Sequence, residues 1–117
     1  MLPSKNRLTK RKDFGAILKK GKSLKEDFLV LKMMRNNLLQ SRFGFVVGTK
    51  ISKKAALRNQ LKRRLRELVK TRMDKIKKGN DIIFIAQPGL EKRDFWELEE
   101  IIDKIFQRIG LIKNLRK

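Results

Sequence analysis

Cationic and amide side chains are concentrated between residues 55 and 70 of this 117-residue chain. On an α-helix of 3.6 residues per turn, six of them fall on one arc roughly 140° wide. They are Arg58, Asn59, Lys62, Arg63, Arg66 and Lys70. Guanidinium and ammonium groups bind phosphates without sequence preference, while an asparagine amide can pair with a base edge or a sugar. The chemistry predicted for this segment is therefore the binding of a polyanion.

Too few acids accompany these cations for an ordinary solvated helix face. Between Lys50 and Lys70 the only acid is Glu67, against nine Lys and Arg, and like charges without acidic partners at i, i+4 repel one another. The net charge of the chain is +20, and all of it lies in residues 1–80, because residues 81–117 have seven cations and seven acids. Self-repulsion of this kind destabilises a fold unless a polyanion neutralises it. Nucleic acid is the first candidate and an anionic membrane surface the second.

The residue types that are missing exclude several chemistries. The chain has no Cys and no His, which excludes disulfides, thiolate catalysis, Cys/His zinc sites and His acid–base catalysis. Carboxylates three or four residues apart between 97 and 103 could hold a nuclease metal, but they lie outside the cationic part of the sequence and read as a solvated acidic face. We therefore expect no catalytic residue and no metal site. Without a secretory signal or a long apolar run, a cytoplasmic location is expected.

The hydrophobic pattern predicts the elements that position these side chains. A first helix is expected at Lys10–Lys20, with Thr9 as its N-cap and Gly21 at its end. Its aromatic residue, Phe14, lies among cations and could stack on a base, as in single-stranded RNA binders. The alternative, that Phe14 is simply a core residue, stays open.

Two strands are expected at Asp27–Met34 and Arg42–Thr49, joined by a turn at Asn36-Asn37 into an antiparallel hairpin. A short extra strand is possible around Lys22–Leu24. Gly44, inside the second strand, indicates a bulge or a close backbone approach.

The cationic helix should begin after Ser52, an available N-cap, and run to Lys75–Lys78, where Gly79 stops it. Its apolar side should pack against the sheet and consists of Leu57, Leu61, Leu65, Leu68 and Val69. Asp81–Ala86 is a continuous apolar run and predicts a strand buried on both faces.

A last helix opens with a capping box at Asp94 and Glu97 and closes at Gly110. Its apolar positions are Leu98, Ile101, Ile102, Ile105 and Ile109. Trp96, near its start, is expected to pack in the core. Three helices and a small mixed sheet make an α+β sandwich.

The central segment resembles the RNR-motif helix of the bacterial ribonuclease P protein family. The family pattern, R-N-x-x-K-R-x-x-R, is filled here by Arg58, Asn59, Lys62, Arg63 and Arg66. The resemblance covers nearly the whole chain and includes Asp13-Phe14, Phe43-Gly44-Phe45, Lys50 and Asp81–Pro88.

The resemblance implies a single-domain, two-layer α+β sandwich over residues 1–117, with the order α-β-β-β-α-β-α. It also implies a small mixed sheet with a left-handed β-α-β crossover (a ribosomal protein S5 domain 2-like fold), although the general rule favours the right-handed form. The implied function is that of the protein subunit of ribonuclease P, the ribonucleoprotein endonuclease that removes the 5′ leader of precursor tRNA. The partner RNA performs the chemistry with magnesium ions that it binds itself, so the protein needs no cofactor.

In this family the RNR helix contacts the catalytic RNA, and a cleft between the first helix and the sheet holds the single-stranded leader. The RNA-binding residues expected here are Arg58, Asn59, Lys62, Arg63, Arg66, Lys50, Lys53, Lys54, Arg11 and Phe14. Three positions depart from the family: Gln60 replaces a frequent cation, and Leu18 and Leu31 stand where aromatics of the cleft are frequent.

Two other functions remain open from the sequence. A structural RNA-binding protein of ribosomal type would share the charge, and a basic amphipathic protein could lie on a membrane surface. The apolar strand Ile82–Ala86 favours a folded sheet over membrane binding. Outside its ribonucleoprotein we expect a monomer with no membrane contact.

Overall fold

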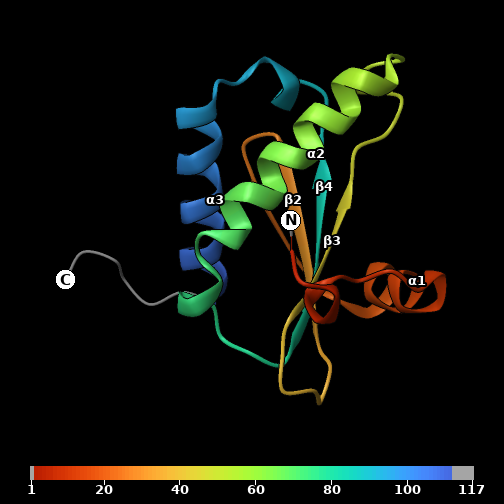
Figure 1. The fold of residues 1–117 in the computed structure, drawn as a ribbon, viewed down its shortest axis with the longest axis vertical. Helices are drawn as coiled ribbons and strands as arrows, with labels where there is room; N and C mark the ends of the chain where they lie inside the picture. Colours follow the sequence, from red (N-terminus) through yellow and green to blue (C-terminus); the bar gives the residue numbers. More distant parts are fainter. Residues whose placement is uncertain (1, 112–117) are drawn as a thin grey trace.

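Three helices and one four-stranded sheet make up the computed structural model, which describes residues 2–111 (Figure 1). The helices are α1 (Arg11–Lys20), α2 (Ala55–Lys70) and α3 (Phe95–Ile109). The strands are β1 (Lys22–Glu26), β2 (Leu29–Arg35), β3 (Arg42–Val46) and β4 (Asn80–Ala86). Short 3₁₀ turns lie at Ser4–Asn6, Met73–Lys75 and Leu90–Lys92. The predicted α+β class and the order α-β-β-β-α-β-α are confirmed, and β1 is the possible extra strand.

The sheet has the order β1-β2-β4-β3, and this order corrects one prediction. Strands β2 and β3 do not form a hairpin, because β4 lies between them, antiparallel to β2 and parallel to β3. The physical reason is the apolar run of β4, which is buried at six of its seven positions. A strand buried on both faces is most stable with a partner on each side, and this preference outweighs the local turn at Asn36-Asn37.

The parallel pair β3 and β4 is joined through α2, and the connection is left-handed (Figure 1). This handedness is rare for a crossover between parallel strands, and only the family resemblance predicted it. Strand β3 is an edge strand in this sheet order, and α2 contacts it.

Side chains alternate between the two faces of the sheet. Helices α2 and α3 cover one face, over a core that includes Leu31, Ile82 and Phe84. Helix α1 packs on the other face, where Ile17 and Ile83 are fully buried. Figure 1 shows α1 projecting from the sheet on the side away from α2 and α3.

Several predicted boundaries and packings around α1 and α2 are wrong. Helix α2 ends at Lys70 rather than at Lys75–Lys78, because the chain turns there and the next arginine binds α3. Leu57 is 48% exposed instead of packed on the sheet, since the first turn of α2 lies beyond the end of β3 (Figure 1). Thr9 does not cap α1, whose N-cap residue is Lys10 and makes no side-chain cap bond.

The strand ends also move. Strand β2 begins at Leu29 rather than at residue 27, because Asp27 has a positive φ of 50° and belongs to the turn after β1. Strand β3 ends at Val46, three residues before the predicted Thr49.

Helix α3 confirms the capping box: the Asp94 carboxylate accepts from the Glu97 N–H at 2.8 Å, and Glu97 accepts from the Asp94 N–H at 3.0 Å. Gly110 ends the helix with φ 81°. The expectation that Trp96 packs in the core is wrong, since its side chain is 73% exposed. Trp96 lies two residues, about 200°, from Leu98 on the buried face.

Among residues 2–111, none of the helices has the length and apolar character needed to cross a membrane.

Candidate nucleic-acid interface

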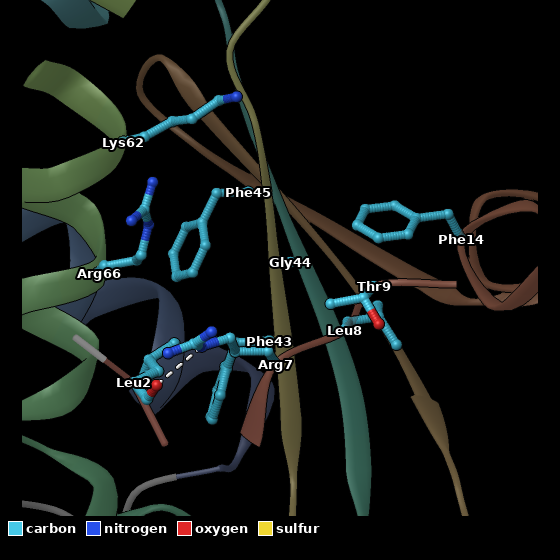
Figure 2. Close-up of a pocket in the computed structure, with 10 residues that line it drawn as sticks. All are labelled: Leu2, Arg7, Leu8, Thr9, Phe14, Phe43, Gly44, Phe45, Lys62 and Arg66. Carbon is cyan, nitrogen blue, oxygen red and sulfur yellow. Dashed lines mark hydrogen bonds between the residues drawn. The ribbon is translucent and has the colours of Figure 1, made fainter. Parts of the chain in front are cut away.

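A cleft of about 230 Å³ follows the edge strand β3. It lies between the N-terminal segment, the first turns of α1 and the middle of α2 (Figure 2). Its lining residues are Leu2, Arg7, Leu8, Thr9, Phe14, Phe43, Gly44, Phe45, Lys62 and Arg66. The cleft therefore combines aromatic rings with cations, which is the composition expected of a site for single-stranded nucleic acid.

Phe14 lies across β3 at Gly44, which is the close backbone approach that the glycine predicted. A Cβ atom added to Gly44 would lie 2.8 Å from Cε1 of the Phe14 ring and still closer to Cζ. The ring also packs against the small core under α1 and is half-buried. One part of the Phe14 surface thus packs in the core and another part lines the cleft. The two interpretations of Phe14 left open by the sequence, core residue or cleft residue, therefore both apply.

The cations of α2 have no acidic partners among the described residues. The ion pairs found between residues 2 and 111 use Arg42, Arg72, Arg93 and Arg108, none of which lies on α2. Lys62 and Arg66 are half-buried in the cleft wall, one helical turn apart. Cations that are partly removed from water without a counter-charge favour an anionic ligand at this place.

Arg42, in contrast, is already neutralised although it lies on β3. Its Nε and Nη2 donate to the two carboxylate oxygens of Asp81 at 2.8 and 2.6 Å, and its Nη1 lies 3.4 Å from Asp13. The hydrogen bond with Asp81 raises the pKa of Arg42 further above its ordinary value, against a smaller opposing effect of burial. This arginine therefore holds the fold together and is not available to a ligand.

The predicted site residues are brought together only in part. Phe14, Lys62 and Arg66 line the same cleft. Arg58 lies one turn before Lys62, and its Nη1 donates to the Ser52 carbonyl at 2.9 Å, which fixes the connector next to the helix. The remaining predicted residues are exposed but do not line the cleft: Arg11, Lys50, Lys53, Lys54, Asn59 and Arg63.

Sequence reasoning missed most of the cleft floor. Phe45 stacks on Phe84, with ring centroids 5.6 Å apart and planes at 15°, and lies on the α2 side of β3, opposite Phe14 (Figure 2). Arg7 donates to the Leu2 carbonyl at 2.8 Å. The alternation Phe43-Gly44-Phe45 in an expected strand was the available signal, since it places rings on one face and a gap on the other.

The structure places Leu18 and Leu31, two of the positions that depart from the family, in different environments. Leu18 is 40% exposed on α1, but Leu31 is fully buried under α2 and α3. Leu31 therefore does not stand in the cleft. Strand alternation puts its neighbours Val30 and Lys32 on the α1 face instead, where the Lys32 ammonium donates to the Leu18 carbonyl at 3.1 Å.

Fold and cleft together define a class: a small α+β protein with a left-handed crossover and an aromatic, cationic cleft at its edge strand. The chain belongs to the ribonuclease P protein family, because the model of the family described as Ribonuclease P matches residues 2–110. The family inferred from the residues is thereby confirmed.

Relatives and solved structures agree with this assignment. The ribonuclease P protein component of Alkaliphilus metalliredigens is 32% identical over 111 residues, covering 95% of this chain and 99% of the relative. That of Thermotoga maritima is 39% identical over 109 residues, covering 90% and 92%. Among solved structures, the RNase P protein of Staphylococcus aureus gives a TM-score of 0.85 at 28% identity, covering 92% of this chain and 98% of the other. The T. maritima RNase P protein gives 0.80 at 37% identity with the same coverage.

Proposed function

We propose that this chain is the protein subunit of ribonuclease P and binds two RNAs at once. The exposed cations of α2 and its connector hold the catalytic RNA, and the cleft along β3 receives the single-stranded 5′ leader of precursor tRNA. The observation that supports this most directly is the presence of Phe14 in one cleft with Lys62 and Arg66, two cations without acidic partners among residues 2–111.

The cleft offers a leader both of the contacts that single strands use. A base can stack on the exposed part of Phe14, a contact worth about 1–3 kcal/mol per base. Phosphates can then lie against Lys62 and Arg66 on the α2 side of the edge strand. Neither contact reads a base edge, so this mode of binding accepts leaders of different sequence.

The chemistry of cleavage is assigned to the partner RNA and its magnesium ions. No group of His, Cys, Asp or Glu between residues 2 and 111 has the arrangement of a metal site. The acids of α3 that could have formed one are engaged elsewhere: Glu99 and Asp103 both bind Arg72. We place the subunit in the cytoplasm, as a monomer outside its ribonucleoprotein, with no cofactor of its own.

The test compares precursor tRNA with mature tRNA in the presence of a ribonuclease P RNA. The protein should restore leader removal at low magnesium and should favour the precursor over the mature tRNA. The double variant K62A/R66A should bind more weakly. The slope of log K against log salt should also become shallower by about 0.7 for each phosphate that the protein no longer neutralises.

A matched control is K92A/K104A, which removes two exposed lysines from the electrically neutral third of the chain. It should leave both the affinity and the salt slope nearly unchanged. Equal affinity of the wild type for the two tRNAs, with no restored cleavage, would refute the leader-binding role and favour a structural RNA-binding protein of ribosomal type.

A further inference from the structure

An acidic residue is the sequence neighbour of Phe14, which lines a cleft whose charged lining residues are all cations. Asp13 directly precedes Phe14 on α1, and it is one of only five acids in residues 1–80. A carboxylate beside a polyanion site opposes binding by simple Coulomb repulsion. Its presence at this position therefore calls for a compensating structural role.

That role is visible in a chain of polar contacts from the sheet to α1. Asp81 of β4 is 5% exposed and accepts from Asn36 at 2.8 Å as well as from Arg42 in a bidentate pair. Arg42 of β3 is thereby fixed in orientation, and its remaining nitrogen, Nη1, reaches the Asp13 carboxylate at 3.4 Å. The pair joins the first turn of α1 to β3 and, through Asp81, to β4.

Other contacts hold α1 at different points. Ile17 is fully buried in the middle of the helix, and the Lys32 ammonium binds the Leu18 carbonyl toward its end. Among residues 2–111, the ion pair of Asp13 with Arg42 is the side-chain polar contact of the first turn. The residue placed by that turn is Phe14, whose ring approaches Gly44 with its Cζ end and also lines the cleft.

We propose that Asp13, held by Arg42, is a positioning residue that orients Phe14 for stacking on a leader base. This inference rests on the proposed leader-binding function. It makes a prediction of unusual sign: removing a negative charge beside the RNA should weaken leader recognition rather than strengthen it.

The experiment measures the ratio of the dissociation constant for mature tRNA to that for precursor tRNA, in the holoenzyme reconstituted with a ribonuclease P RNA. D13N should lower this ratio about three- to tenfold, a part of the decrease that removal of a complete stacking interaction would give. D13N should not weaken binding of mature tRNA. D74N removes the same charge at an exposed position without an ion pair among residues 2–111 and should leave the ratio unchanged.

Two further variants separate positioning from general destabilisation. D13E keeps the carboxylate on a longer side chain that can still reach Arg42 and should recover most of the ratio. In an F14A background, D13N should change the ratio no further, because the ring that it positions is gone.

The outcomes are distinguishable. If D13N keeps the wild-type ratio while F14A lowers it, or if D13E is as defective as D13N, the positioning role is overturned and leader binding stands. If the wild type itself shows a ratio of one, the proposed function fails before Asp13 is considered.

Discussion

The contact between Phe14 and Gly44 gives the sharpest test of the cleft geometry. In G44A, the new methyl group would overlap the Phe14 ring at the cleft floor. Forcing one extra carbon into a packed site costs about 1–3 kcal/mol. Alanine in place of glycine within a strand contributes about 0.5–1 kcal/mol in the opposite direction. The net expectation is that G44A lowers the free energy of unfolding by up to about 2.5 kcal/mol.

The same substitution should have the opposite effect once the ring is removed. In an F14A background the overlap is gone, so G44A should raise the free energy of unfolding by about 0.5–1 kcal/mol. The double-mutant coupling then equals the overlap cost itself, about 1–3 kcal/mol. Urea unfolding of the wild type, the two single variants and the double variant measures it directly.

The control for this cycle is G48A, because a Cβ atom at Gly48 meets no other atom within 4 Å. Its effect on unfolding should be the same with and without Phe14. A G44A cost that is equal in both backgrounds would show that Phe14 does not lie on Gly44, and the described cleft would then be wrong.

Two further predictions concern the elements that present α2 and α3. R72A should lower the free energy of unfolding by about 1–3 kcal/mol in a urea titration. Arg72 is 12% exposed and joins the end of α2 to Glu99 and Asp103, two carboxylates that stay partly solvated. The control is K70A, an exposed position two residues earlier, which should cost less than about 0.5 kcal/mol. D94A should lower the free energy of unfolding by about 1 kcal/mol, because it removes the capping box of α3. The control is E100A, at an exposed position of the same helix. Equal melting temperatures of D94A and E100A would contradict the stabilising role of the cap.

Local patterns in the sequence predicted the type and order of the elements, although the end of α2 and the ends of two strands were wrong. The 3.6-residue period of α3, with its capping box and terminal glycine, predicted that helix almost to the residue, since each signal acts within one or two turns. The apolar run at Asp81–Ala86 predicted a strand buried on both faces, because this signal also lies within a few consecutive residues. The charge of the central helix was equally local, because it follows from composition and spacing alone.

Strand pairing, by contrast, could not be derived from local signals. The turn at Asn36-Asn37 favoured pairing of β2 with β3, but β4 separates them, because burying its apolar faces stabilises the sheet more than a local hairpin does. The handedness of the crossover had to be taken from the family resemblance. The exposure of Trp96, unlike the strand pairing, could have been derived from the helical period, which places this residue about 200° from the buried Leu98.

The candidate site divides in the same way. Composition and spacing alone indicated a polyanion-binding face through Arg58, Lys62 and Arg66, because these cations on one helix face have too few acids near them in the sequence. The packing of distant segments then brought Phe14 into one cleft with Lys62 and Arg66, across an edge strand. It also withdrew Arg42 from the site through Asp81 and Asp13. Asp13 and Asp81 are 68 residues apart along the chain, and such contacts arise only when the sheet brings distant segments together.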